Sequence, residues 1–118
     1  MPGTILIVDD DPTLVHALGQ FFEKEGYRAL TSPDGVDALK QVEAHHPDLI
    51  ILDIQMPRLH GYSFLFELRK IDGNQDIPVI VLTSFVEMGG MFQAEGVKEF
   101  LVKPCTPQLL LEKVKKYI

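Results

Sequence analysis

Short apolar runs alternate along this chain with longer segments in which apolar residues recur at every third or fourth position. Four runs combine β-branched, aliphatic or aromatic residues and end at charged or turn-forming residues; they lie at 4–8, 49–52, 79–82 and 99–102. Runs of this length and composition are typical of strands buried on both faces of a parallel sheet. One more short strand is predicted from Tyr27 to Thr31.

The intervening segments have the period of amphipathic helices. Residues 12–25 carry apolar side chains at helical spacing, with Pro12 in the first turn and Gly26 closing the helix. Three more helices are predicted: one that Asp34 caps and His45-His46-Pro47 ends, one from Gly61 to Ile71, and one that starts at Thr106-Pro107 and continues to Ile118.

The segment from Phe85 to Gly96 stands where the alternation requires another helix. Gly89 and Gly90 lie within it, and each glycine costs roughly 1 kcal/mol of helix stability against alanine. We therefore expect this helix to be short or frayed.

Strands that alternate with helices in this way predict an α/β domain. Its five-stranded parallel sheet would carry helices on both faces, with right-handed crossovers between the strands. The natural strand order is 2-1-3-4-5, which makes the domain a flavodoxin-like, doubly wound fold. In such folds, ligands bind beyond the carboxyl ends of the strands, at the point between strands 1 and 3 where the winding reverses.

Polar residues with related chemistry follow the predicted strands at this edge. Asp9 and Asp10 follow the first strand, Asp53 the third, Thr83 the fourth and Lys103 the fifth. Because all strands of a parallel sheet point the same way, we expect these side chains to converge. Three carboxylates, a hydroxyl and an ammonium suit a divalent metal ion and a phosphoryl group.

Composition narrows the class of protein further. The 118 residues, 46% of them hydrophobic, suffice for one domain over 1–118 with its own core. A net charge of −6 argues against direct binding to nucleic acid, which requires a basic face. The only cysteine, Cys105, excludes an internal disulfide, and no apolar run approaches the roughly 20 residues of a membrane span. With no signal peptide at its start, the chain is expected to be cytoplasmic.

Four motifs resemble those of the receiver domain of two-component response regulators, in the same order and over essentially the whole chain. They are Ile-Leu-Ile-Val-Asp-Asp-Asp-Pro at 5–12, Leu-Ile-Ile-Leu-Asp-Ile-Gln-Met-Pro at 49–57, Val-Ile-Val-Leu-Thr-Ser at 79–84 and Glu-Phe-Leu-Val-Lys-Pro at 99–104. The resemblance implies specific roles: phosphoacceptor for Asp53, Mg²⁺ ligands for Asp9 and Asp10, phosphoryl-oxygen ligands for Thr83 and Lys103, and aromatic switch for Phe100.

The residues themselves support this chemistry. A carboxylate can attack phosphorus in line, but crowding several acids at one sheet edge raises the cost of ionising them, which a hard divalent cation removes. Mg²⁺ prefers oxygen ligands, so Asp9, Asp10, Asp53 and the backbone carbonyl of Gln55 are the expected ligands, with waters completing the shell. Lys103 and Thr83 would share the charge that develops on the phosphoryl oxygens.

The resemblance also implies partners: a histidine kinase or phosphotransfer protein that supplies the phosphoryl group, and a downstream protein or attached output domain that reads it. A second copy of the chain, with which it would form a dimer on phosphorylation, is another expected partner. The main alternative is a pseudo-receiver, a protein-interaction module that works without phosphorylation, although such modules usually lack the acid pair, the acceptor or the lysine.

Two other functional classes share parts of this pattern. A hydrolase of the haloacid dehalogenase type needs an acid two residues after the nucleophile, where this chain has Gln55. A flavodoxin-like flavin binder needs a phosphate loop after the first strand, where Asp9, Asp10 and Asp11 would repel phosphate.

Asp11 itself is expected to be a first-turn acid of the helix and not a ligand. The Lys103-Pro104 bond is predicted to be cis.

Overall fold

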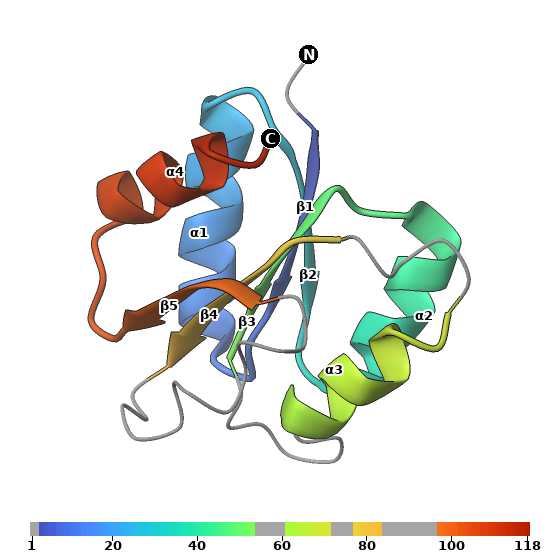
Figure 1. Ribbon diagram of the computed structural model, residues 1–118. Coiled ribbons are helices and arrows are strands. Elements are labelled where there is room, and N and C mark those ends of the chain that lie inside the picture. The colour runs from blue at the N-terminus through green and yellow to red at the C-terminus, as the bar shows by residue number, and fades with distance from the viewer. Residues whose placement is uncertain (1–2, 54–60, 72–76, 84–96) are drawn as a thin grey trace.

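The computed structural model describes residues 3–53, 61–71, 77–83 and 97–118. Its five parallel strands form one sheet in the order β2-β1-β3-β4-β5, which confirms the predicted 2-1-3-4-5 topology (Figure 1). The strands are β1 (Thr4–Val8), β2 (Arg28–Ser32), β3 (Leu49–Leu52), β4 (Val79–Thr83) and β5 (Val97–Val102). The predicted helix at 85–96, like Gln55, lies outside the described residues.

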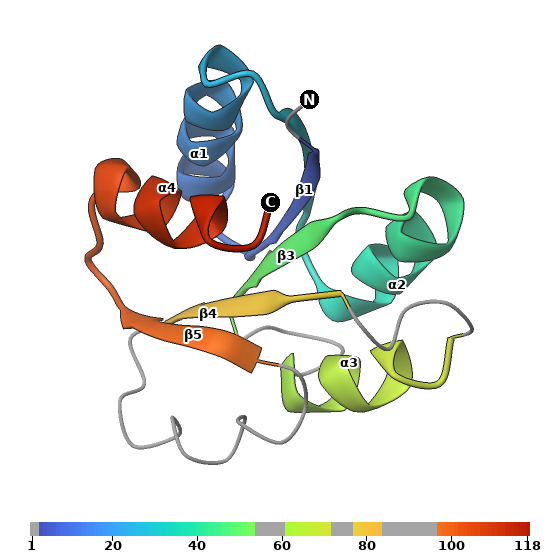
Figure 2. The ribbon, with the colours of Figure 1, turned by 45° about the horizontal axis from the view of Figure 1, so that its top comes forward.

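Among the described residues, four helices cover the two faces of the sheet. They are α1 (Pro12–Lys24), α2 (Gly35–His45), α3 (Gly61–Leu68) and α4 (Pro107–Lys115). Helices α1 and α4 lie on one face, and α2 and α3 lie on the other (Figures 1 and 2). The domain is therefore doubly wound, as predicted.

The alternation of side chains along β1 divides the core into two layers. Ile5 and Ile7 are buried against α1 and α4, whereas Leu6 and Val8 are buried against α2 and α3. Both faces of the strand are therefore apolar, which explains why the sequence reads as a continuous apolar run and not as an alternation of apolar and polar residues.

Three helices begin at side chains that accept hydrogen bonds from their first turns. Asp11 accepts from the amides of Thr13 and Leu14, at 3.0 and 3.3 Å. Asp34 and Thr106 cap α2 and α4 in the same way. Because the cap satisfies N–H groups that have no partner within the helix, each is worth about 1 kcal/mol. Asp11 is therefore a helix cap.

Several predicted boundaries are wrong by one to three residues. Strand β5 begins at Val97 and not at Glu99, and α4 ends at Lys115 and not at Ile118, because the amides of Lys116 and Tyr117 bond three residues back. The second strand runs from Arg28 to Ser32 and not from Tyr27 to Thr31, because Tyr27 is tied back to α1: its amide donates to the Phe22 carbonyl, and its ring packs edge-on against Phe22. Helix α3 ends at Leu68 and not at Ile71, because the amides of Lys70 and Ile71 bond three residues back and tighten the chain into a turn. Ile71 nevertheless packs against the core.

Within the described residues, no helix is both long and apolar enough to span a membrane. The Lys103-Pro104 peptide bond is cis, as predicted.

Candidate functional site

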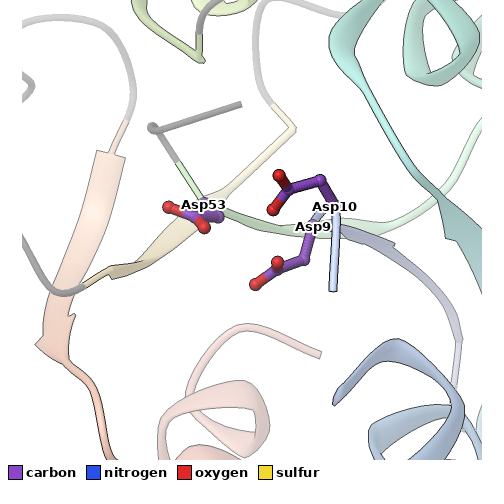
Figure 3. A group of neighbouring side chains, drawn as sticks. All are labelled: Asp9, Asp10 and Asp53. Atoms are coloured by element: carbon purple, nitrogen blue, oxygen red, sulfur yellow. The ribbon is translucent and has the colours of Figure 1, made fainter. Parts of the chain in front are cut away.

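Three aspartates meet at the carboxyl ends of the two central strands β1 and β3. Asp9, Asp10 and Asp53 each offer a carboxylate oxygen, and these oxygens lie within 4.8 Å of one another. In Figure 3, the carboxylates of Asp9 and Asp10 extend from the end of β1 toward the side on which Asp53 lies. The sheet itself brings them together, because the amide of Asp53 donates to the carbonyl of Val8 at 2.9 Å, one step beyond the β1–β3 ladder.

Lys103, which follows the edge strand β5, reaches across to this group. Its ammonium nitrogen lies 2.7 Å from Asp9 Oδ2 and 3.2 Å from Asp53 Oδ2. The two carboxylates are nearly inaccessible to solvent, with side-chain exposures of 4% and 8%, whereas the lysine retains 26%. A cation that contacts both buried acids offsets part of their mutual repulsion.

The environment shifts the pKa values of the paired groups. Burial raises the pKa of Asp9 above its ordinary value, against the opposing effects of the Lys103 hydrogen bond and the Asp11 amide. For Lys103, burial lowers the pKa, but the hydrogen bonds and charges of Asp9 and Asp53 together outweigh burial and leave the pKa raised. Lys103 is therefore a fixed positive charge at neutral pH.

Backbone and side-chain contacts fix the position of Asp9. Its Oδ1 accepts the amide of Asp11 at 3.0 Å, its Oδ2 accepts Lys103, and its own amide donates to the carbonyl of Ser32 at 3.0 Å. Asp9 was predicted from the sequence, but these supporting hydrogen bonds were not. The hydrogen bond from the Asp11 amide to the Asp9 carboxylate could have been predicted, because an aspartate often accepts the amide of the residue two positions later in a turn.

Of the other predicted site residues, Thr83 lies at the same edge of the sheet and Phe100 lies within β5. Thr83 is the last residue of β4 and pairs in register with Val102 of β5, the residue before Lys103. Phe100 is partly buried and packs against the apolar layer under α2 and α3. Gln55, the expected carbonyl ligand, lies outside the described residues.

The three carboxylates fit a small divalent cation. Asp9 and Asp53 are buried, while Asp10 is exposed. Mg²⁺ takes oxygen ligands and typically keeps several waters, so an all-oxygen group with one exposed member suits it. With Lys103 on the other side, the site presents two positive partners to an incoming anion once a metal ion is bound.

The sequence matches the family model of the response regulator receiver domain over residues 5–115. The chain belongs to this family. Receiver domains act in two-component signal transduction as signalling domains, bind Mg²⁺ at an acidic pocket, and interact with histidine kinases or phosphotransfer proteins and with output domains.

Two curated relatives illustrate the range of proteins that this receiver domain resembles. The polar-differentiation response regulator DivK of Brucella anthropi is 30% identical over 120 residues, which cover 100% of this chain and 98% of the relative. The probable transcriptional regulator ycf27 of Cyanophora paradoxa is 34% identical over 116 residues, which cover 97% of this chain but 47% of the relative. The chain therefore spans about half the length of the ycf27 relatives that it matches.

Solved receiver structures share the whole architecture. Chemotaxis protein CheY4 of Vibrio cholerae superposes with a TM-score of 0.92 at 28% identity, and the match covers 100% of both chains. Response regulator TrrA of Thermotoga maritima, solved in complex with Mg²⁺–BeF, superposes with a TM-score of 0.87 at 35% identity, again over 100% of both chains.

Proposed function

We propose that this receiver domain accepts a phosphoryl group on Asp53 in a reaction that depends on Mg²⁺. The observation that carries the proposal is the placement of Asp53 beside Asp9 and Asp10, with the Lys103 ammonium in contact with Asp9 and Asp53. The TrrA relative, 35% identical, was solved with Mg²⁺ and beryllofluoride, a mimic of a phosphoryl group, which supports the same use of this site.

Asp53 is the nucleophile in this proposal. One carboxylate oxygen attacks phosphorus in line, an O–P bond forms, and the bond from phosphorus to the leaving group breaks. With a phosphohistidine donor, that bond is P–N, and the imidazole leaves with its electron pair and takes a proton from solvent. Asp53 suits the role because it is held by its backbone bond to Val8 at the carboxyl end of a buried strand.

Asp9, Asp10, Asp53 and the Gln55 carbonyl are the proposed Mg²⁺ ligands. Bound there, Mg²⁺ would neutralise the crowded carboxylates and stabilise negative charge on the phosphoryl oxygens. Lys103 would hold a second phosphoryl oxygen through its ammonium, and Thr83 a third through its hydroxyl. Three separate partners would then share the charge that develops in the transition state.

Thr83 and Phe100 are the proposed switch residues. They lie on the neighbouring strands β4 and β5, and Phe100 packs in the layer under α2 and α3 while Lys103, three residues later, reaches the site. A pull on Thr83 by the phosphoryl group would change the space open to Phe100, so that a change in charge becomes a change in packing.

The proposed phosphoryl donor is a histidine kinase or a phosphotransfer protein, and the proposed reader is a downstream protein, an attached output domain or a second copy of the domain. The pseudo-receiver alternative assigns the domain an interaction role without phosphorylation. It is the less favoured of the two, because Asp9, Asp10, Asp53 and Lys103 are all present and gathered at one point.

Intact mass spectrometry after incubation with acetyl phosphate tests the proposal. We expect one added phosphoryl group in the presence of Mg²⁺ and none in EDTA. Asp53→Ala should abolish the gain, whereas Asp48→Asn, which changes an exposed aspartate remote from the site, should retain it. An equal gain in Asp53→Ala, or no gain in the wild type, would support the pseudo-receiver alternative or another acceptor residue.

A further inference from the structure

Buried polar side chains are concentrated beside the site, in the turn between β2 and α2 as well as in the site itself. Among the described residues, four polar or charged residues are buried: Asp9, Ser32, Asp34 and Asp53. Asp9 and Asp53 belong to the proposed phosphorylation site. Ser32 and Asp34 do not, although Ser32 is 1% exposed and Asp34 is 5% exposed. Burying a polar group costs free energy unless it is hydrogen-bonded. The hydrogen-bond partners of Ser32 and Asp34 therefore indicate which parts of the structure this turn holds in position.

Ser32 is bonded directly to the backbone of Asp9. The Ser32 carbonyl accepts the Asp9 amide at 3.0 Å. This hydrogen bond lies one residue beyond the β1–β2 ladder, whose last pair is Val8 with Ser32. No further strand pairing supports it on that side, because the chain turns away after Ser32 to start α2. Its geometry therefore depends on how firmly Ser32 is held.

Two side chains of α2 hold the end of β2. The hydroxyl of Ser32 lies 2.8 Å from Asp37 Oδ2 and 2.9 Å from the carbonyl of Asp34. Gln41, one turn further along α2, donates through Nε2 to the same Asp37 oxygen at 2.9 Å and to the carbonyl of Thr31 at 2.6 Å. Consecutive residues of the strand end, Thr31 and Ser32, are thus both tied to α2.

Asp37 is the centre of this network. Its carboxylate accepts from the side chains of Ser32 and Gln41, and its amide donates to Asp34 Oδ1, the cap of α2, at 2.8 Å. Hydrogen bonds to an ionised acceptor are stronger than those between neutral groups. A chain of contacts therefore runs from α2 through Asp37 and Ser32 to the amide of Asp9.

We infer that Ser32 is a positioning residue for the acidic pair at the end of β1, held in place by Asp37. The inference rests on the proposed function where it concerns Mg²⁺, because Asp9 is a proposed ligand. Mg²⁺ demands near-ideal ligand geometry, and outer contacts that orient a ligand typically change metal affinity by about 10- to 100-fold. Ser32 supports Asp9 through the backbone, while Lys103 and the Asp11 amide support its carboxylate.

Ser32→Ala tests the inference at two levels. Without the hydroxyl, the strand end loses its tie to Asp37, so the Asp9 amide should exchange with solvent about five- to tenfold faster in the metal-free domain, measured by NMR. The Asp53 amide, which donates to Val8, is the internal reference and should be unaffected. Mg²⁺ affinity, measured by calorimetric titration, should fall about tenfold.

Matched variants separate positioning from a general loss of stability. Ser63→Ala removes the hydroxyl of an exposed serine on α3 and should leave both readouts at the wild-type value. Asp37→Ala breaks the network at its centre and should reproduce both effects of Ser32→Ala. A variant that only destabilises the fold would accelerate the exchange of Asp53 and Asp9 alike.

The inference is overturned if Ser32→Ala and Asp37→Ala leave Asp9 exchange at the wild-type rate, or bind Mg²⁺ with wild-type affinity although the wild type binds it. Failure of the proposed function has a different signature. In that case, the wild-type domain itself binds no Mg²⁺, and exchange of the Asp9 amide still decides whether Ser32 positions it.

Discussion

The ammonium of Lys103 lies closer to the carboxylate of Asp9 than to that of Asp53, at 2.7 Å against 3.2 Å. Lys103 therefore pairs with a proposed metal ligand as well as with the proposed phosphoacceptor. This gives the lysine two expected effects: it stabilises the crowded acids while no metal is bound, and it stabilises the phosphoryl group during transfer. These effects have opposite consequences for Mg²⁺ affinity and for phosphorylation.

Lys103→Met should separate the two effects. Without the ammonium, Asp9 and Asp53 lose their cationic partner, so Mg²⁺ affinity should rise several-fold because the metal no longer competes with a positive charge. The rate of phosphorylation by acetyl phosphate at saturating Mg²⁺ should fall by about 100-fold, because one partner of the developing charge is gone. Calorimetric titration and time-resolved mass spectrometry measure the two quantities.

Lys98→Met is the control for Lys103→Met, since it removes an exposed lysine of the same strand and should change neither quantity. A Lys103→Met domain that loses Mg²⁺ affinity in proportion to its rate would contradict a direct role for the ammonium at the phosphoryl group.

The hydrogen bond between Tyr117 and Glu99 should make stability depend on pH. The Tyr117 hydroxyl donates to Glu99 at 2.8 Å, and this bond is the main reason that the pKa of Glu99 lies below its ordinary value of 4.5. A carboxylate whose pKa is lowered on folding stabilises the fold above its unfolded pKa, and this contribution disappears as pH falls through the folded pKa.

Tyr117→Phe should therefore lower the free energy of unfolding by about 1 kcal/mol at neutral pH. The difference from wild type should shrink as the pH falls below 4.5, the ordinary pKa of Glu99. Urea titrations across this pH range measure it. In a Glu99→Gln background, which cannot ionise, the effect of Tyr117→Phe should no longer vary with acid pH; an unchanged pH dependence there would assign it to another group.

Glu23 should protect the edge of the sheet that β2 forms. Strand β2 lies at that edge, and the Glu23 carboxylate accepts the outward-facing amide of Ala29 at 2.7 Å. Glu23→Ala would leave this amide open to pairing with another chain, so the variant should self-associate at high concentration in analytical ultracentrifugation. Glu23→Gln, which keeps an acceptor oxygen, should stay at the wild-type mass. Self-association of both variants would mean that the carboxylate charge, and not the hydrogen bond to Ala29, controls association, and a Glu23→Ala domain that stays at the wild-type mass would contradict a protective role for Glu23.

Phe100 should report phosphorylation if it is a switch residue. Adding beryllofluoride and Mg²⁺ should move the NMR signals of the Phe100 ring, while those of Phe22, a buried residue of α1 on the other face of the sheet, should move little. Thr83→Ala should suppress the movement without preventing the mimic from binding. A Phe100 ring that responds equally in Thr83→Ala would show that Thr83 does not link the site to this packing.

The sequence predicts most of the fold because one physical signal dominates it. Apolar runs such as 4–8 and 49–52 identify strands buried on both faces, and the caps Asp11, Asp34 and Thr106 define the starts of helices. Boundaries were less accurate where local hydrogen bonding decides the outcome, as at Tyr27 and Ile71, because the choice between a helix turn and a tight turn carries little sequence signal.

The candidate site was predictable in its parts but not in its connections. Parallel strands bring their ends together, so the proximity of Asp9 and Asp53 follows from topology. The contact between Lys103 and Asp9 depends on side-chain rotamers, which the sequence pattern does not predict. The support of Asp9 by Ser32 depends on a single backbone hydrogen bond at the end of the strand pairing. Ser32 gave no signal of its own because a serine before a proline usually marks only a turn.

The most direct test of the account is to locate the phosphoryl group chemically. An aspartyl phosphate is an acyl phosphate, which sodium borohydride reduces to the alcohol and so converts the modified aspartate into homoserine. After treatment with acetyl phosphate and Mg²⁺, peptide sequencing by mass spectrometry should find homoserine at position 53 alone, and EDTA should abolish it. Homoserine at position 9 or 10, or none at 53 in a domain that has gained a phosphoryl group, would contradict the assignment of Asp53 as the acceptor.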